Sequence, residues 1–146
     1  MHHFGVLIPS TNTTVEIEYS RLLPASLQVH VGRLLTSGTG PFAPSKDDDI
    51  DYQAKLLGTA KVEVISLAQT SASLFADDYD ANVTQRMSAA ANCPSITSAQ
   101  AIGQSRQECR AGRSPLPPGP SASATRATYA RLTRGPHHAR QPALAR

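Results

Sequence analysis

Short apolar runs alternate with longer segments of mixed polarity along the first two thirds of the chain. The apolar runs predict four strands, at residues 4–8, 27–35, 62–68 and 95–97. Helices are expected between them at 14–23, from residue 45 onward and at 80–91, and a further helix from Ser98. Strands that alternate with helices indicate a parallel sheet, and short apolar strands indicate cover on both faces. The predicted fold is therefore α/β, a Rossmann-like three-layer sandwich with a short parallel sheet of about four strands.

Local signals place the ends of the first two helices. Thr13 and Glu16 have the spacing of a capping box, and Pro24 ends the helix that follows. Ser45, followed by Lys and two Asp, is expected to cap the second helix. Three apolar residues share one face of that helix and are expected in the core: Ile50, Ala54 and Leu57.

The composition changes sharply after residue 104. Residues 1–104 carry three Lys and three Arg against ten Asp and Glu, a net charge of −4. Residues 105–146 carry eight Arg and one Glu, a net charge of +7, with six of the eleven prolines and no Val, Ile, Phe or Met. Such a segment buries too little apolar surface to offset its chain entropy. We therefore predict an α/β domain at 1–104 and a disordered tail at 105–146.

Two interpretations of this tail remain open. An Arg-rich disordered arm is typical of segments that bind nucleic acid or another acidic partner. Arg, Pro, Ala, Gly and Ser without Lys or Ile are also what GC-rich coding DNA yields when it is read out of frame. We favour the out-of-frame interpretation because the tail has one aromatic residue, Tyr129, and no repeated basic motif. Nucleic-acid binding is therefore not expected.

The chain shows no sign of a membrane or secretory segment. No apolar stretch approaches the length of a membrane span, and no basic segment precedes the apolar run at 4–8. The two cysteines, Cys93 and Cys109, show neither the spacing of a metal site nor a disulfide framework. The expected location is a reduced cytoplasm.

Small polar residues directly follow the first and third predicted strands. They are Pro9, Ser10 and Asn12 after the first strand, and Gln69, Thr70 and Ser71 after the third. Because the carboxyl ends of parallel strands meet at one edge of a sheet, beside helix N-termini, this arrangement indicates an anion-binding site. Ser, Thr and Asn are also ordinary turn and cap residues, so the pattern alone leaves a structural role open.

Four segments together resemble a known family. They are Gly5-Val-Leu-Ile-Pro-Ser-Thr-Asn-Thr-Thr-Val-Glu16, Arg21-Leu-Leu-Pro24, Val64-Ile-Ser-Leu-Ala-Gln-Thr-Ser-Ala-Ser73 and Ile96-Thr-Ser-Ala-Gln-Ala101. Over residues 4–104 the chain resembles the N-terminal half of the maleate isomerase and arylmalonate decarboxylase group, in the Asp/Glu racemase superfamily. The resemblance implies two similar α/β halves that face each other across a cleft, with no metal and no organic cofactor.

The resemblance also implies a reaction and a substrate class. It implies an isomerase or decarboxylase that acts on a small dicarboxylate through an enediolate or a cysteine-based mechanism. In complete members of the group the second half supplies another catalytic cysteine. We therefore expect this chain to be a truncated, inactive half.

Individual roles follow from the same resemblance. Thr70 and Ser71 match the residues of a dioxyanion hole, which stabilises an enediolate. Asn12 matches an asparagine that contacts the substrate carboxylate, and Pro9 matches a position that lines the pocket. Ser10 lies on the same loop and is assigned to substrate binding with them.

Gln69 departs from the family pattern. It occupies the position where racemases and maleate isomerases carry their first cysteine. An amide can be neither the base nor the nucleophile at neutral pH. Gln69 therefore argues against two-thiol racemisation and against a maleate-type covalent mechanism, and it leaves a one-cysteine decarboxylase or an unassigned relative. It could also hydrogen-bond the substrate.

The other ionisable residues make weaker candidates. Asp47, Asp48 and Asp49 have the composition of a Mg²⁺ cluster, but an acidic first helical turn is the simpler interpretation. Cys93 precedes the fourth strand and is expected on the wrong side of the sheet, and His30 is expected to be a packed or surface strand residue. The chain has no Gly-rich phosphate loop, so no NAD or ATP is predicted. No metal is predicted either, in agreement with what the resemblance implies.

A second function class stays open. A non-enzymatic α/β binding module would use a basic disordered arm to hold acidic partners.

An exposed half-cleft would also favour self-association into a homo-oligomer.

Overall fold

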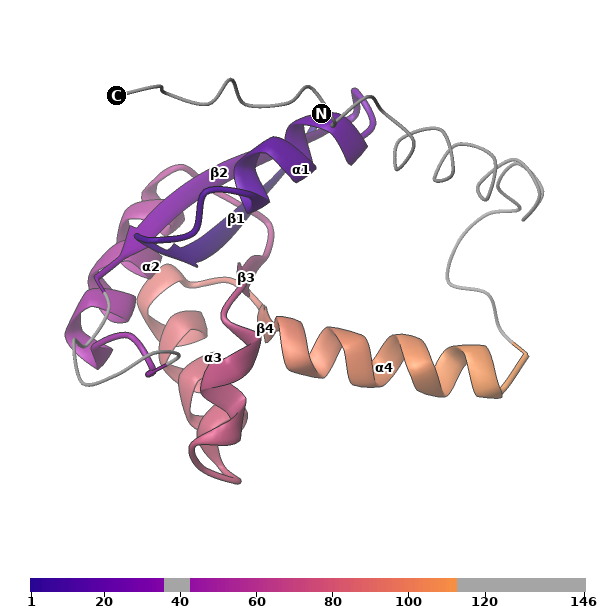
Figure 1. Cartoon of the computed structure of the whole chain (residues 1–146). Coiled ribbons are helices and arrows are strands. Elements are labelled where there is room, and N and C mark those ends of the chain that lie inside the picture. Colours follow the sequence, from indigo (N-terminus) through magenta and orange to yellow (C-terminus); the bar gives the residue numbers. More distant parts are fainter. Residues whose placement is uncertain (36–42, 113–146) are drawn as a thin grey trace, which may run out of the picture. The chain divides into compact units, whose positions relative to one another are not determined.

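The computed structural model describes residues 1–35 and 43–112 (Figure 1). Strands and helices alternate within them, and the whole sheet lies in one unit, Met1–Gln107. The elements are β1 (His2–Pro9), α1 (Val15–Leu22), β2 (Leu27–Leu34), α2 (Asp47–Thr59), β3 (Ile65–Leu67), the 3₁₀-helix η1 (Thr70–Leu74), α3 (Tyr79–Ala91), β4 (Ser95–Thr97) and α4 (Ser98–Arg110).

The four strands form one parallel sheet in the order β2-β1-β3-β4. Gly5 of β1 lies opposite His30 on one side and Ile65 on the other, and Ile65 lies opposite Ser95 of β4. The predicted four-stranded parallel α/β fold is confirmed. The strand bounds differ in detail: β1 begins two residues earlier than expected, and β3 is confined to Ile65–Leu67, in the second half of the predicted run at 62–68.

Helices cover both faces of the sheet. On one face α2 and α3 enclose the main core, in which Leu7, Ile65 and Met87 are fully buried. The predicted apolar face of α2 belongs to this core, with Ile50, Ala54 and Leu57 buried. Side chains alternate along a strand, so Phe4 points to the other face. There its ring meets the ring of Tyr19 of α1 edge to face, with the centroids 5.6 Å apart.

Both predicted helix caps are wrong. Glu16 does not close a capping box with Thr13, because Arg33 of β2 pairs with its carboxylate. Instead Asn12 Oδ1 accepts the first backbone N–H groups of α1. At α2, Lys46 is the capping position and has no side-chain cap, while the Ser45 hydroxyl donates to Gln69. In both cases a partner distant in sequence outcompetes the local one.

The helix that starts at Ser98 continues past the predicted boundary at residue 104. It ends at Arg110 and buries none of its side chains. The rest of the expected tail, from residue 113 onward, lies outside the described residues. Within 1–35 and 43–112, none of the helices has both the length and the apolar character needed to cross a bilayer.

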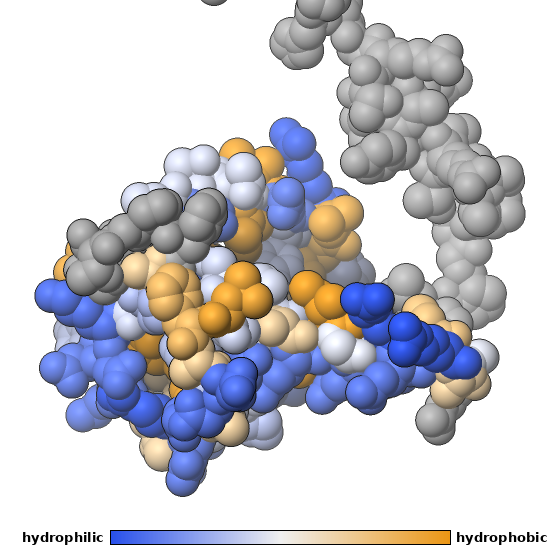
Figure 2. All heavy atoms as spheres, turned by 60° about the horizontal axis from the view of Figure 1, so that its bottom comes forward, coloured by the Kyte–Doolittle hydropathy of each residue, from blue (hydrophilic) through white to orange (hydrophobic). Residues whose placement is uncertain are grey.

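Large apolar side chains remain on the surface of the described unit. Leu22, Leu35, Leu74 and Phe75 are more than half exposed. On the face shown in Figure 2, apolar residues gather in the middle with hydrophilic residues around them. Exposed apolar surface is typical of interaction sites. The expected self-association remains a prediction.

Gly58 sets how closely α2 approaches α3. A Cβ atom at this position would lie 2.6 Å from the carbonyl oxygen of Ala91 and 2.8 Å from its Cα. Replacing glycine by alanine inside a helix normally stabilises it by about 1 kcal/mol. Here we expect Gly58→Ala to destabilise the fold by roughly 1–3 kcal/mol in urea unfolding, because backbone must move to admit the methyl group.

Gly103 in α4 is the matched control for Gly58. A Cβ atom there would meet no described atom within 4 Å. Gly103→Ala should therefore leave the urea midpoint unchanged or raise it, and should increase the helical signal in circular dichroism. Equal stability losses in the two variants would contradict a close α2–α3 contact at Gly58.

Tyr79 should make the stability of the fold depend on alkaline pH. Its hydroxyl is buried without a hydrogen-bond partner among the described residues. Burial, with the charges of Asp47 and Asp80, raises the pKa of Tyr79 to about 12. The unfolded chain then loses this proton first, near pH 10 as is usual for tyrosine, so the stability that Tyr79 contributes is present below that pH and is lost as the pH rises toward 12.

Unfolding in urea between pH 8 and 11 tests this dependence. Since Tyr79 is only partly buried, we expect the wild-type chain to lose about 1 kcal/mol more than Tyr79→Phe over this range. At neutral pH the substitution should be neutral or stabilising, because it removes an unsatisfied hydroxyl. Tyr52→Phe, at an exposed position of α2, controls for the loss of a hydroxyl at neutral pH. Identical pH profiles for wild type and Tyr79→Phe would contradict the argument.

Candidate functional site

A cleft of about 540 Å³ lies at the carboxyl ends of β1, β3 and β4. Its walls come from the loop after β1, the segment before α2, the start of η1 and the start of α4. The lining residues are Pro9, Thr11, Asn12, Val15, Ala43, Ala68, Gln69, Thr70, Ser71 and Ser98. Of the predicted site residues, all but Ser10 lie in this lining. The cleft thus joins residues from four separate stretches of the chain.

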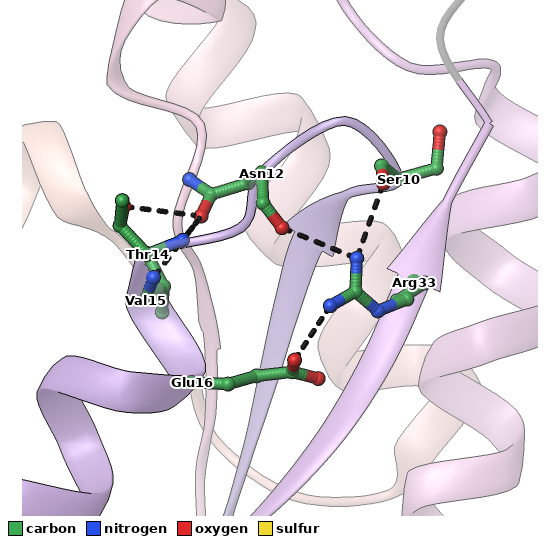
Figure 3. A network of polar contacts seen from close by, with 6 residues as sticks. All are labelled: Ser10, Asn12, Thr14, Val15, Glu16 and Arg33. Carbon is green, nitrogen blue, oxygen red and sulfur yellow. Dashed lines mark hydrogen bonds and ion pairs between the residues drawn. The ribbon is translucent and has the colours of Figure 1, made fainter. Parts of the chain in front are cut away.

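Arg33 holds the loop after β1 in place (Figure 3). Its Nη1 donates to the backbone oxygens of Ser10 and Asn12, each at 3.1 Å, and its Nη2 meets the carboxylate of Glu16 at 2.5 Å. The guanidinium therefore ties β2 to the loop and to the first turn of α1. Ser10, which was predicted to bind substrate, contributes its backbone to this clamp. The sequence pattern did not single out Arg33, because its partners Ser10, Asn12 and Glu16 lie more than 15 residues away along the chain.

Asn12 lines the cleft and caps α1 with its carboxamide oxygen. Its Oδ1 accepts from the backbone N–H groups of Thr14 at 3.0 Å and Val15 at 3.1 Å (Figure 3). Backbone N–H groups can only donate, so this atom is the oxygen and the other is the Nδ2 donor. The Nδ2 group has no partner among the described residues. Asn12 can therefore cap α1 and donate to a bound anion at the same time.

Gln69 fastens another wall of the cleft. Its side chain is buried, with 6% of the residue exposed. Its Nε2 donates to the Ala43 carbonyl at 2.9 Å, and its Oε1 accepts from the backbone N–H of Ser45 at 3.3 Å and the Ser45 hydroxyl at 3.1 Å. Three of its hydrogen bonds thus go to one neighbouring segment. At the position predicted for a family cysteine, this amide joins the strand end to the chain before α2.

Two hydroxyl groups in the lining of the cleft are in contact. Thr70 Oγ1 and Ser98 Oγ lie 2.7 Å apart, and either atom can be the donor. Thr70 and Ser71 begin η1, whose first N–H groups have no acceptor inside the helix. Ser98 was predicted only as a helix start. Its position in the sequence could have identified it, because Ser98 directly follows β4 just as Gln69 and Thr70 come shortly after β3.

The lining of the cleft is neutral. None of its described residues carries an ionisable side chain, so the site supplies hydrogen-bond donors and no proton carrier. Cys93 lies outside it, before β4, where it packs against the core and burial raises the pKa of its thiol. His30 is also remote, with its ring nitrogen 2.9 Å from that of His3. The expectation that neither residue serves the site agrees with these positions.

The acidic turn at the start of α2 is occupied by structural contacts. Asp47 and Asp51 pair with Arg86 of α3, and these contacts raise the pKa of the guanidinium. Asp49 Oδ2 accepts the backbone N–H of Leu35 at 2.6 Å. Over residues 1–35 and 43–112, no three His, Cys, Asp or Glu side chains are grouped as a metal site requires.

Solved structures of arylmalonate decarboxylase have a similar fold. A glycine-to-cysteine variant in a sulfate-associated form shares 25% sequence identity with this chain, at a TM-score of 0.57. The match covers 72% of this chain and 46% of that one. The unliganded enzyme gives a TM-score of 0.59 at 23% identity, over 73% of this chain and 45% of that chain. The chain thus spans about half the length of these neighbours.

The comparison confirms the predicted resemblance at the level of the fold. The described residues have the architecture of one half of an Asp/Glu racemase-type protein. No protein-family model matches the sequence. A search of curated proteins likewise finds no match.

The hydrogen bonds between Gln69 and the segment before α2 can be tested by substitution. Gln69→Leu leaves the Ala43 carbonyl and the Ser45 N–H without their partner, and burying such groups unpaired costs about 1–3 kcal/mol. We expect a lower urea midpoint and faster hydrogen exchange at the Ser45 amide. Gln85→Leu, at an exposed position of α3, is the control. If both variants behave alike, Gln69 does not fasten this wall.

Proposed function

We propose that this chain is the carboxylate-binding half of a cofactor-independent enzyme, a decarboxylase or isomerase acting on small dicarboxylates of the malonate type. One observation carries the proposal: neutral donors from Asn12, Thr70, Ser71 and Ser98 converge in one cleft. The similarity of the fold to arylmalonate decarboxylase supports the substrate class.

The chemistry of the substrate class suits such a cleft. When a malonate loses CO₂, the electron pair of the broken C–C bond moves onto the remaining carboxyl group and forms an enediolate. Loss of a proton beside a carboxylate forms the same kind of ion. Preorganised donors aimed at the oxygens stabilise this charge. Thr70 and Ser71 supply hydroxyl donors for this purpose, and Asn12 supplies its Nδ2 group.

The same cleft lacks the group that would complete the reaction. The enediolate carbon must receive a proton from an acid, and the described lining has no Cys, His, Asp, Glu, Lys or Tyr. Gln69 cannot act as a thiol, and its amide is committed to Ala43 and Ser45. We therefore propose that the chain by itself binds the dicarboxylate without turning it over, and that catalysis requires a proton donor from elsewhere.

Titration of the full chain with malonate, followed by NMR, tests the binding half of the proposal. We expect shifts at the Thr70, Ser71 and Ser98 amides. Thr70→Val keeps the shape of the side chain and removes the hydroxyl. It should weaken malonate binding by about 5–10-fold, which corresponds to the free energy of one hydrogen bond. Thr59→Val is the control, since the Thr59 hydroxyl bonds to Leu56 at the end of α2.

Assay of CO₂ release from phenylmalonate tests the proposal that the chain by itself does not turn over its substrate. The wild-type chain should release CO₂ no faster than Thr70→Val or buffer alone. Turnover that Thr70→Val removes would show that the chain holds its own acid. Malonate shifts that are absent, or that Thr59→Val changes as much as Thr70→Val, would overturn the binding site itself.

A further inference from the structure

The contact between Thr70 and Ser98 limits what the two hydroxyls can offer to a ligand. Each hydroxyl has a single proton, and at 2.7 Å one of the two is used in the bond between them. The accepting hydroxyl keeps its own proton free. The pair therefore presents one directed donor, and donation within a chain of hydrogen bonds strengthens the outer bond.

A reciprocal cap at the start of α4 fixes the position of Ser98. The backbone N–H of Thr97 donates to Gln100 Oε1 at 3.0 Å, and the backbone N–H of Gln100 donates to Thr97 Oγ1 at 3.2 Å. These are the two bonds of a capping box. Thr97 is also buried, with 2% exposed. Ser98 is thus held between a buried strand end and a capped helix turn.

Thr70 is the more suitable member of the pair to contact a ligand. Its β-branched side chain has fewer favoured rotamers than serine, so its oxygen is the better fixed point. It directly follows Gln69, whose side chain is immobilised by its three hydrogen bonds. Ser98 follows the neighbouring strand β4 and can rotate its hydroxyl to donate to Thr70.

We propose that Ser98 is a positioning residue of the site: its hydroxyl donates to Thr70 Oγ1 and directs the Thr70 proton toward a carboxylate oxygen of the bound dicarboxylate. This assignment rests on the proposed function and gives Ser98 a role through Thr70 in place of a direct contact with the ligand. In this arrangement Ser98 acts through Thr70. Removing Ser98 leaves the Thr70 hydroxyl free to rotate away from the ligand.

A double-mutant cycle on malonate affinity tests the assignment. We expect Ser98→Ala to weaken malonate binding by about 3–10-fold in the wild-type background. In the Thr70→Val background the same change should have almost no further effect, because the group that Ser98 positions is gone. Ser98→Thr keeps a hydroxyl at the first turn of the helix and should restore most of the affinity.

Ser88 provides a matched control outside the cleft. Its hydroxyl lies 2.8 Å from that of Ser95, an equally short pair between α3 and β4. Ser88→Ala should leave malonate affinity unchanged even if it lowers stability. The urea midpoint of Ser98→Ala separates folding from binding, since a merely structural role would change the midpoint and not the coupling with Thr70.

The outcomes distinguish this inference from the proposed function. If Thr70→Val weakens malonate binding and Ser98→Ala does not, the proposed function stands and the role of Ser98 is wrong. Additive losses in the double variant would also overturn it, because Ser98 would then act independently of Thr70. If the wild-type chain does not bind malonate, both the proposed function and the role of Ser98 fall.

Discussion

Parallel ladders of β1 with β2 and β3, and of β3 with β4, place the carboxyl ends of all four strands at the same edge of the sheet. Three walls of the cleft depend directly on this arrangement, since the chain emerges there after β1, β3 and β4, and Gln69 bonds the segment before α2 to them. The ladders are in turn held by the core beneath them, where Gly5 lies against Leu57 and Ile65. A change of register would separate the polar loops and remove the site.

Charged and amide side chains hold the walls of the cleft in place through hydrogen bonds. Arg33 and Gln69 bond mainly to loop backbone, where no regular ladder satisfies the polar groups. Asn12 divides its carboxamide between the start of α1 and the cleft. The hydroxyls of Thr70 and Ser98, bonded to one another, and the hydroxyl of Ser71 are further groups of the lining that a ligand can engage. Rigid walls matter here because electrostatic stabilisation depends on donors that are already in position.

The neutrality of the cleft narrows its chemistry. The positive charge of Arg33 is offset by Glu16 and lies behind the loop rather than in the lining. Dipolar donors can bind a carboxylate and stabilise an enediolate, but they cannot carry a proton to carbon. In the proposed function, the described cleft supplies the binding part of the reaction, and the proton donor comes from elsewhere.

Local pattern was enough to predict the order of strands and helices, the parallel sheet, the buried face of α2 with Ile50, and the polar loops that lie at the cleft. These depend on periodicity and on residues adjacent in sequence. The pairing of Glu16 with Arg33, the bonds of Arg33 to the loop after β1 and the pairing of Ser98 with Thr70 were not predictable in this way. Each is a competition among donors and acceptors far apart along the chain, and packing of the sheet alone determines which of them come within hydrogen-bonding distance.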